Sequence, residues 1–148
     1  MLLDTYWPDL ITVLADRIAR RTSALVKVEG LNLSQWRVLA AIADVPGRSA
    51  ADVVGITPMD KGIVSRATKS LLDRSLIRRE VSTTDGRIGH LFLSDAGMQL
   101  YQRLRPQVSD ILHITSLSTE EQQTLIAQIQ VLLSELPAVD ESKPKTKA

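Results

Sequence analysis

Short polar and cationic residues recur at helical spacing between residues 57 and 74 of this chain. They are Lys61, Gly62, Ser65, Arg66 and Lys69. At about 3.6 residues per turn these positions share one face of a helix, and the apolar residues between them fall on the other face. Arginine and lysine pair with phosphate or with guanine O6 and N7, serine does so more weakly, and a glycine lets the backbone come close. The pattern indicates a helix that binds double-stranded DNA, or an ordinary amphipathic helix with solvated charges.

The residues before this helix favour a helix-turn-helix arrangement. Thr57 is predicted to cap the helix, with Pro58 at its first position and Asp60 as the acid of a capping box. Residues 48–55 predict a shorter helix, and residues 55–57 turn the chain into the next one. In such a pair the second helix enters the major groove through its N-terminal residues.

A β-hairpin is predicted directly after the helix. Residues 76–81 and 88–93 have strand character, and the turn-rich run 82–87 separates them. Arg87 lies at the tip, where its guanidinium suits the negative potential of a minor groove. Asp85 is predicted to brace the tip by accepting hydrogen bonds from turn amides or from Arg87 in a bidentate pairing. A plain hairpin turn is the alternative.

Three motifs in this order resemble the MarR family of bacterial transcription regulators. They are LSQWRVLAAI from Leu33 to Ile42, MDKGIVSR from Met59 to Arg66, and Asp85-x-Arg87 followed by Leu91-x-Leu93-Ser94-x-x-Gly97. The resemblance runs from about Asp4 to Leu136. It implies a mostly α fold with a small antiparallel β-hairpin wing, that is, a winged helix-turn-helix with N- and C-terminal dimerisation helices. One departure is Ser75, where the family usually has glycine, so Ser75 must adopt a left-handed cap or the helix must end differently.

Apolar stripes near both ends of the sequence predict further long helices. The first, opened by Pro8 and Asp9, carries Ile11, Leu14, Ile18, Leu25 and Val28; the next, capped by Ser94 and bent at Pro106, carries Tyr101, Leu104, Val108, Ile111 and Leu112; the last, opened by a capping box at Ser118, carries Leu125, Ile126, Ile129, Leu132, Leu133 and Leu136. One winged-helix module cannot cover all three stripes, so we expect a homodimer.

The expected organisation is a single domain over residues 1–138 with a flexible tail at 139–148. Within it we expect a DNA-binding lobe at about 31–93 and dimerisation helices at about 6–29 and 94–136.

Composition bounds the possible functions. The chain has 148 residues, 44% of them apolar, and a net charge of only +1, so it does not coat nucleic acid as a polycation. The segment from Asp60 to Arg87 has a balance of +3, which makes the positive charge local. No long apolar run and no signal peptide are evident, so a cytoplasmic protein without membrane contact is expected. The absence of cysteine excludes disulfides, thiolate zinc sites and thiol-based oxidant sensing.

Enzymatic chemistry finds little support in the sequence. His90 and His113 are the only histidines, they lie on different predicted elements, and no metal-ligand spacing or nucleotide-binding glycine pattern accompanies them. A structural role for each is more common, and no cofactor is expected.

A charge inside the first apolar stripe suggests an effector site. Arg21 falls between Ile18 and Leu25, where an unpaired charge in a dry interface is costly. An acid from the partner subunit, or extension of the side chain to solvent, would satisfy it. Alternatively, Arg21 lines a ligand pocket with Arg17 and Trp36, and the family resemblance implies that such a pocket binds small aromatic acids or phenols.

Sequence and resemblance together predict a dimeric regulator that binds a pseudo-palindromic operator and is released by a small molecule. The resemblance implies that the regulator is a repressor and that the ligand is an aromatic or phenolic acid. A winged-helix scaffold that binds other proteins is one alternative. A regulator without any small-molecule effector is another.

Overall fold

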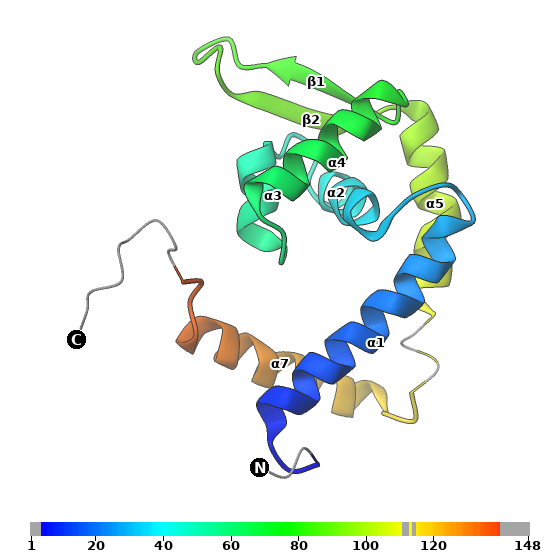
Figure 1. Cartoon of the computed structure of the whole chain (residues 1–148), viewed down its shortest axis with the longest axis vertical. Helices are drawn as coiled ribbons and strands as arrows, with labels where there is room; N and C mark the ends of the chain where they lie inside the picture. The colour runs from blue at the N-terminus through cyan, green and yellow to red at the C-terminus, as the bar shows by residue number, and fades with distance from the viewer. Residues whose placement is uncertain (1–3, 111–112, 114, 140–148) are drawn as a thin grey trace, which may run out of the picture. The chain divides into compact units, whose positions relative to one another are not determined.

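The computed structural model describes residues 4–110, 113 and 115–139 (Figure 1). Contacts divide the chain into two compact units, residues 1–111 and 112–148. The first unit contains α1 (Trp7–Lys27), α2 (Leu33–Asp44), α3 (Ala50–Ile56), α4 (Lys61–Asp73), β1 (Ile77–Val81), β2 (Gly89–Leu93) and α5 (Asp95–Ser109), and the second contains α7 (Thr119–Glu135). A mostly helical fold with one antiparallel hairpin confirms the predicted winged helix-turn-helix class.

The core of the first unit lies where α2, α4 and the hairpin meet. Its fully buried large side chains come from all of these elements and from α1, α3 and α5: Leu39, Ile42, Leu71, Leu91, Leu104, Val26, Val38, Val53 and Val64. Val26 is buried, whereas Val28, predicted on the same stripe, is the C-cap of α1 and is 87% exposed. The prediction for Val28 is wrong because the helix ends at Lys27, so that helical periodicity no longer applies to it.

Capping boxes begin the helices α2 and α3. Asn32 accepts a hydrogen bond from the Gln35 amide in α2, and Ser49 accepts one from the Asp52 amide in α3. Asp52 returns the bond by accepting from the Ser49 amide at 2.8 Å. The hydrogen bonds from Ser49 hold the pKa of Asp52 below its usual range.

The helix α4 begins at Lys61, three residues later than the predicted first position at Pro58. Asp60 is the N-cap and accepts from the Ile63 amide at 2.7 Å, so the predicted roles of Thr57, Pro58 and Asp60 are wrong. Thr57 instead ends α3, and its hydroxyl donates to the Val53 carbonyl at 2.7 Å. The segment between the helices is not helical and buries the Met59 side chain, and therefore Asp60 rather than Thr57 reaches the free amides.

At its C-terminus α4 closes with Ser75 in the left-handed region, at φ 56°. The Ser75 amide donates to the Leu72 carbonyl and the Leu76 amide to the Leu71 carbonyl. These bonds form a Schellman motif, which satisfies carbonyls at the helix end. Ser75 was expected either to adopt a left-handed cap or to leave the helix to end differently. The structure has the left-handed cap, at a position that favours glycine.

The hairpin pairs Ile77 with Leu93 and Val81 with Gly89. Both strands begin one residue later than predicted, because Leu76 and Ile88 belong to the turns at either end. The loop before α3 extends this sheet: the Gly47 amide donates to the Leu91 carbonyl, and the Leu91 amide donates to the Arg48 carbonyl. A loop far from the hairpin in the sequence is thereby joined to it at Leu91.

The helix α5 packs closely against the start of the hairpin. Ser94 caps it by accepting from the Gly97 amide, and the Ser94 hydroxyl donates to the Ser75 carbonyl at 2.6 Å. A side chain at Gly97 would place its Cβ 1.9 Å from the Leu76 carbonyl oxygen. Pro106 lies inside the helix as predicted, while Ile111 and Leu112 of the predicted stripe lie outside the described residues.

Two arginines bind the residues that directly follow α1 and so connect this helix to the rest of the first unit. The Arg74 guanidinium donates to the Gly30 carbonyl at 2.9 Å and to the Glu29 carbonyl at 3.3 Å, just beyond the end of α1. Arg103 on α5 binds both carboxylate oxygens of Glu29 at 3.3 and 3.4 Å. The bonds from Arg74 satisfy carbonyls at a helix C-terminus, where positive charge is favourable.

Each unit leaves an apolar helix surface exposed. On α1 the surface includes Trp7, Leu10, Ile11, Leu14 and Ile18, all at least 40% exposed. On α7 it includes Leu125, Ile126, Ile129, Val131 and Leu133, of which Leu133 is 68% exposed. The helix α7 begins with the predicted capping box of Ser118 and Glu121 and buries none of its residues. No described helix is long and apolar enough to cross a membrane.

Candidate nucleic-acid interface

The helix α4 separates its residues into a buried and an exposed face. Val64, Ala67 and Leu71 are buried in the core, and Thr68 joins them. The five residues predicted to meet DNA are all exposed: Lys61, Gly62, Ser65, Arg66 and Lys69. Lys61 opens the helix, so the most N-terminal turn, which also has the positive end of the helix dipole, carries a cation. The structure thus brings the predicted set together on one accessible face.

Gly62 leaves room for the side chain of Arg66. A Cβ at position 62 would lie 3.3 Å from Nη1 of Arg66 and 3.4 Å from Oδ1 of Asp60. Contacts this short are tighter than ordinary van der Waals contact, so a larger residue would push the Arg66 guanidinium away. Gly62 therefore affects the direction of Arg66 as well as the approach of the backbone.

Lys69 differs from the other cations of this face because it has an acidic partner. Its Nζ lies 2.8 Å from Oδ2 of Asp73, one helical turn later. The hydrogen bond and the charge of Asp73 raise the pKa of Lys69. Any anionic ligand would have to compete with Asp73 for this ammonium group, so Lys69 is less available than the other predicted cations.

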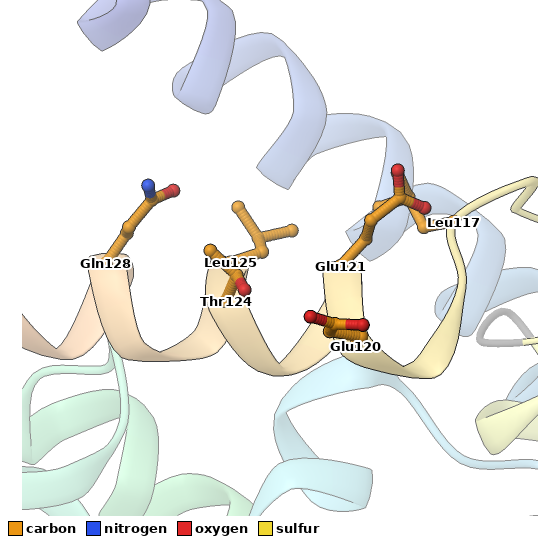
Figure 2. A pocket seen from close by; sticks show the side chains of 6 residues that line it. All are labelled: Leu117, Glu120, Glu121, Thr124, Leu125 and Gln128. Atoms are coloured by element: carbon orange, nitrogen blue, oxygen red, sulfur yellow. The ribbon is translucent and has the colours of Figure 1, made fainter.

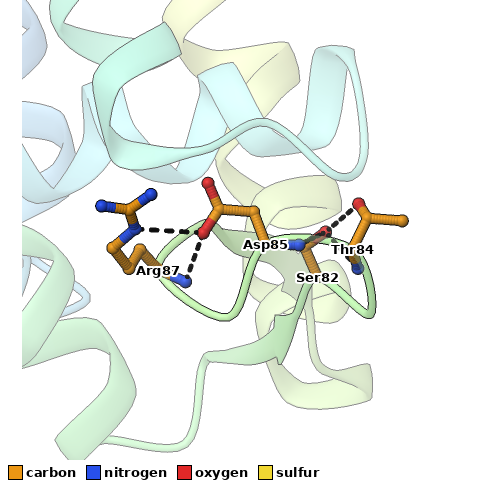
Figure 3. Close-up of polar contacts among 4 residues, drawn as sticks. All are labelled: Ser82, Thr84, Asp85 and Arg87. Carbon is orange, nitrogen blue, oxygen red and sulfur yellow. Dashed lines mark hydrogen bonds and ion pairs between the residues drawn. The ribbon is translucent and has the colours of Figure 1, made fainter.

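The tip of the wing is held together by side-chain hydrogen bonds (Figure 3). Oδ1 of Asp85 accepts from the Arg87 amide at 3.0 Å and from Arg87 Nε at 3.3 Å. Both bonds go to one carboxylate oxygen, so the brace is as predicted but the bidentate pairing is not. The Ser82 hydroxyl accepts from the amides of Thr84 and Asp85 and closes the other half of the turn. The Arg87 side chain remains 91% exposed, and therefore it can bind a ligand.

Sequence analysis missed the contacts that hold the base of the wing. Nδ1 of His90 lies 2.9 Å from the Gly47 carbonyl oxygen, in addition to the backbone pairing of Gly47 and Arg48 with Leu91. Gly47 has φ 92°, and a Cβ there would touch the Phe92 ring at 3.5 Å. His90 therefore has a structural partner, in agreement with the interpretation preferred for it, and the wing is tied to the loop before α3.

The proposed effector residues have different surroundings. Trp36 is only 6% exposed, and its ring stacks on Tyr101 of α5 with centroids 5.6 Å apart. Arg17 and Arg21 are exposed on α1, and within the part of the chain that is described neither forms an ion pair. Exposure satisfies Arg21 in the single chain, as expected for a side chain that extends to solvent.

A shallow pocket of about 310 Å³ lies within the second unit and involves none of these residues (Figure 2). Its lining comes from the start of α7 and the preceding loop: Leu117, Glu120, Glu121, Thr124, Leu125 and Gln128. The Glu121 carboxylate is engaged in the helix cap, 2.7 Å from the Ser118 amide. Over residues 4–110, 113 and 115–139, no group of three His, Asp or Glu side chains could hold a metal ion.

Comparisons with solved structures show the same architecture over nearly the whole chain. A transcriptional regulator of the MarR family from Silicibacter pomeroyi has 23% identity and a TM-score of 0.81, over 93% of this chain and 94% of that one. A mutant MarR from E. coli complexed with operator DNA has 19% identity and a TM-score of 0.74, over 90% and 99% of the two chains. The PcaV regulator from Streptomyces coelicolor, in complex with its natural ligand, has 22% identity and a TM-score of 0.69, over 90% and 96%.

Sequence comparison reaches less far along the chain. No curated protein matches it. The sequence model of the MarR family matches residues 29–88, which include α2, α3, α4 and the wing as far as Ile88. Residues 29–88 are therefore similar in sequence to the MarR family, and the chain as a whole has the fold of the solved MarR-family regulators.

Proposed function

We propose that this chain is a transcription regulator that binds double-stranded DNA through α4 and the wing. The observation that carries the proposal is the joint exposure of the cationic face of α4 and of Arg87 in one compact unit. Lys61, Ser65 and Arg66 are placed to meet the major groove, while Arg87 suits the adjacent minor groove. The fold of the operator-bound E. coli MarR supports this assignment.

The DNA-binding species is proposed to be a homodimer that recognises a pseudo-palindromic operator. The exposed apolar surfaces of α1 and α7 are the surfaces available for a second copy. A dimer with twofold symmetry presents two α4 helices to two half-sites, which accounts for the operator symmetry that we expect. Repression would follow where such an operator overlaps a promoter.

Retention of a promoter fragment in a gel-shift assay at physiological salt tests the DNA-binding function. The region upstream of the chain's own gene is the first probe, and an unrelated fragment of equal length is the control. Specific retention that is lost in Arg66→Ala and in Arg87→Ala supports the proposal. No retention of the promoter fragment would instead favour a scaffold that binds other proteins. Retention that neither substitution affects would mean that another face of the chain meets DNA.

Release by a small aromatic or phenolic acid is proposed as the regulatory step. Arg21 and Arg17 on α1 would pair with the carboxylate, and Trp36 would contribute to the aromatic wall of the site beside Tyr101. The ligand would favour one spacing of the two α4 helices and release DNA through that differential affinity. The PcaV regulator, which has the same fold, was solved in complex with its natural ligand and is a precedent for a ligand site in this fold.

Calorimetry with a panel of aromatic acids tests the effector separately from DNA binding. Arg21→Ala should retain operator affinity and lose the response to the acid. If no acid binds the wild type or shifts its operator affinity, the chain is a regulator without such an effector.

A further inference from the structure

The inner face of the wing carries an arginine that has no role in the site described above. Side chains alternate between the two faces of a strand, so Arg79 shares its face with Ile77 and with its cross-strand partner Leu91. Ile77 and Leu91 are 3% and 2% exposed and pack in the core with α2 and α4. Arg79 continues the same face outward, beyond the edge of the core, and is exposed.

Gly89 provides the surface on which the Arg79 side chain lies. A Cβ at position 89 would be 2.0 Å from Nε of Arg79 and 2.7 Å from its Cζ and Nη2. The guanidinium group therefore occupies the space that any other residue at position 89 would fill. Gly89 itself is buried, although it lies near the exposed end of the hairpin.

Arg79 also lacks the interactions that engage its neighbour. Arg78, on the opposite face, forms an ion pair with Glu80, and its Cζ lies 4.6 Å from the centroid of the Phe92 ring. Among the described residues, none forms a hydrogen bond or an ion pair with Arg79. A side chain that is positioned by the backbone but has no anionic partner is available for a ligand anion.

We propose that Arg79, positioned by Gly89, binds a phosphate of the DNA strand that passes between the major and the minor groove. This inference rests on the proposed function. If α4 lies in the major groove and Arg87 in the adjacent minor groove, the sugar–phosphate backbone that separates the grooves crosses the inner face of the wing. Arg79 is the cation on that face, and guanidinium groups bind phosphate in a fixed geometry.

The test is the salt dependence of DNA affinity, measured by fluorescence anisotropy with the full chain and a retained promoter fragment. Arg79→Ala should lower the slope of log Kd against log salt by about one and weaken binding about fivefold near 150 mM salt, equally on specific and unrelated DNA. Arg78→Ala is the matched control, because it removes the same charge from the opposite face of the same strand, and it should leave the slope unchanged.

The role of Gly89 is tested by a double-mutant cycle. Gly89→Ala should displace the guanidinium and lower the salt slope as Arg79→Ala does, whereas a loss of stability alone would lower the melting temperature without changing the slope. In the Arg79→Ala background the Gly89→Ala substitution should have no further effect on DNA affinity. An additive effect would overturn the positioning role.

An unchanged slope in Arg79→Ala, in a protein whose binding still depends on Arg66 and Arg87, would overturn the phosphate contact and leave the proposed function standing. DNA affinity that depends on none of Arg66, Arg79 and Arg87 would instead contradict the proposed function itself.

Discussion

Asp85 and Arg87 show how single residues orient an exposed cation at the tip of the wing. One carboxylate oxygen accepts from both the amide and the Nε of Arg87, yet the guanidinium remains 91% exposed. The pair is too exposed to contribute much to folding. Its effect is instead to restrict the directions that the Arg87 side chain can take, which would reduce the entropy lost if Arg87 binds DNA as proposed.

We expect Arg87→Ala to weaken operator binding by roughly 1–3 kcal/mol, as for a direct base contact, and to leave the melting temperature nearly unchanged. Asp85→Ala should weaken binding in the same direction, because it acts through the position of Arg87. A double-mutant cycle measured by anisotropy should therefore show that the two effects do not add. Wild-type affinity in both single variants would refute the assignment of the wing.

Gly62 is expected to affect stability and binding in opposite directions. Alanine in place of an exposed helical glycine should stabilise the fold by roughly 0.5–1 kcal/mol in chemical unfolding. The added Cβ would lie 3.3 Å from Nη1 of Arg66, so DNA affinity should fall in the same variant. Gly55→Ala is the control, since a Cβ at that helical position meets nothing within 4 Å. Equal operator affinity in the wild type and Gly62→Ala would contradict the role given to Gly62.

At the scale of elements, the wing is positioned by contacts at the middle of β2 and at the base of the hairpin. Gly47 and Arg48 pair with Leu91 in β2, and Ser94 and Gly97 hold the start of α5 against Ser75 and Leu76 before β1. Movement of α5 would therefore be transmitted to the base of the hairpin. The orientation of the wing relative to α4 depends on these close backbone contacts.

Gly97→Ala should be among the most destabilising single substitutions in the first unit. Its Cβ would lie 1.9 Å from the Leu76 carbonyl oxygen, and the obstacle is backbone rather than a flexible side chain. We expect a loss of more than about 3 kcal/mol in the free energy of unfolding, in the upper range for point substitutions. Denaturant titration measures this loss, and Gly55→Ala is the control. If the free energies of unfolding of the two variants differ by less than about 1 kcal/mol, as for ordinary surface changes, α5 can move away from Leu76 without cost.

The elements were predictable from sequence where local signals determine them. Ser94 and the Ser118 capping box each mark a helix start that lies at the predicted residue, and the hairpin follows from turn residues between two segments with strand character. The start of α4 was not predictable in this way. Thr57 and Asp60 are both good caps, and the choice between them depends on burial of Met59, which is a tertiary contact.

The candidate site was predictable to a similar extent. The exposed face of α4 and the Asp85 brace follow from helical spacing and turn chemistry. Two contacts could not be inferred from the sequence. The packing of Arg79 over Gly89 depends on strand register, and the hydrogen bond between His90 and Gly47 joins residues 43 positions apart. The arrangement of Arg17, Arg21 and Trp36 as a ligand site stays a prediction.

For the whole molecule, the exposed apolar surfaces of α1 and α7 are the feature that most needs a partner. Leu133 is 68% exposed on α7, an unusual position for a leucine among several other exposed apolar residues. Homodimerisation would bury such a surface. It would also place two DNA-binding modules at a fixed separation.

Leu133→Glu should therefore shift the chain from dimer to monomer in sedimentation experiments, since a charge buried in an apolar interface costs several kcal/mol. The melting temperature of the monomer should change little, because the side chain is exposed. Gln130→Glu introduces the same charge at another exposed position of α7 and should stay dimeric. A wild-type chain that sediments as a monomer would refute the dimer.

Hydroxyl-radical footprinting of the intact protein on a retained promoter fragment tests the central claim most directly, namely that α4 and the wing bind DNA together. We predict protection in two half-sites about one helical turn apart, each with an adjacent protected minor-groove segment. Arg87→Ala should lose protection of the minor-groove segments alone, whereas Arg66→Ala should weaken the whole footprint. A footprint that keeps every protected segment in both variants would contradict the claim.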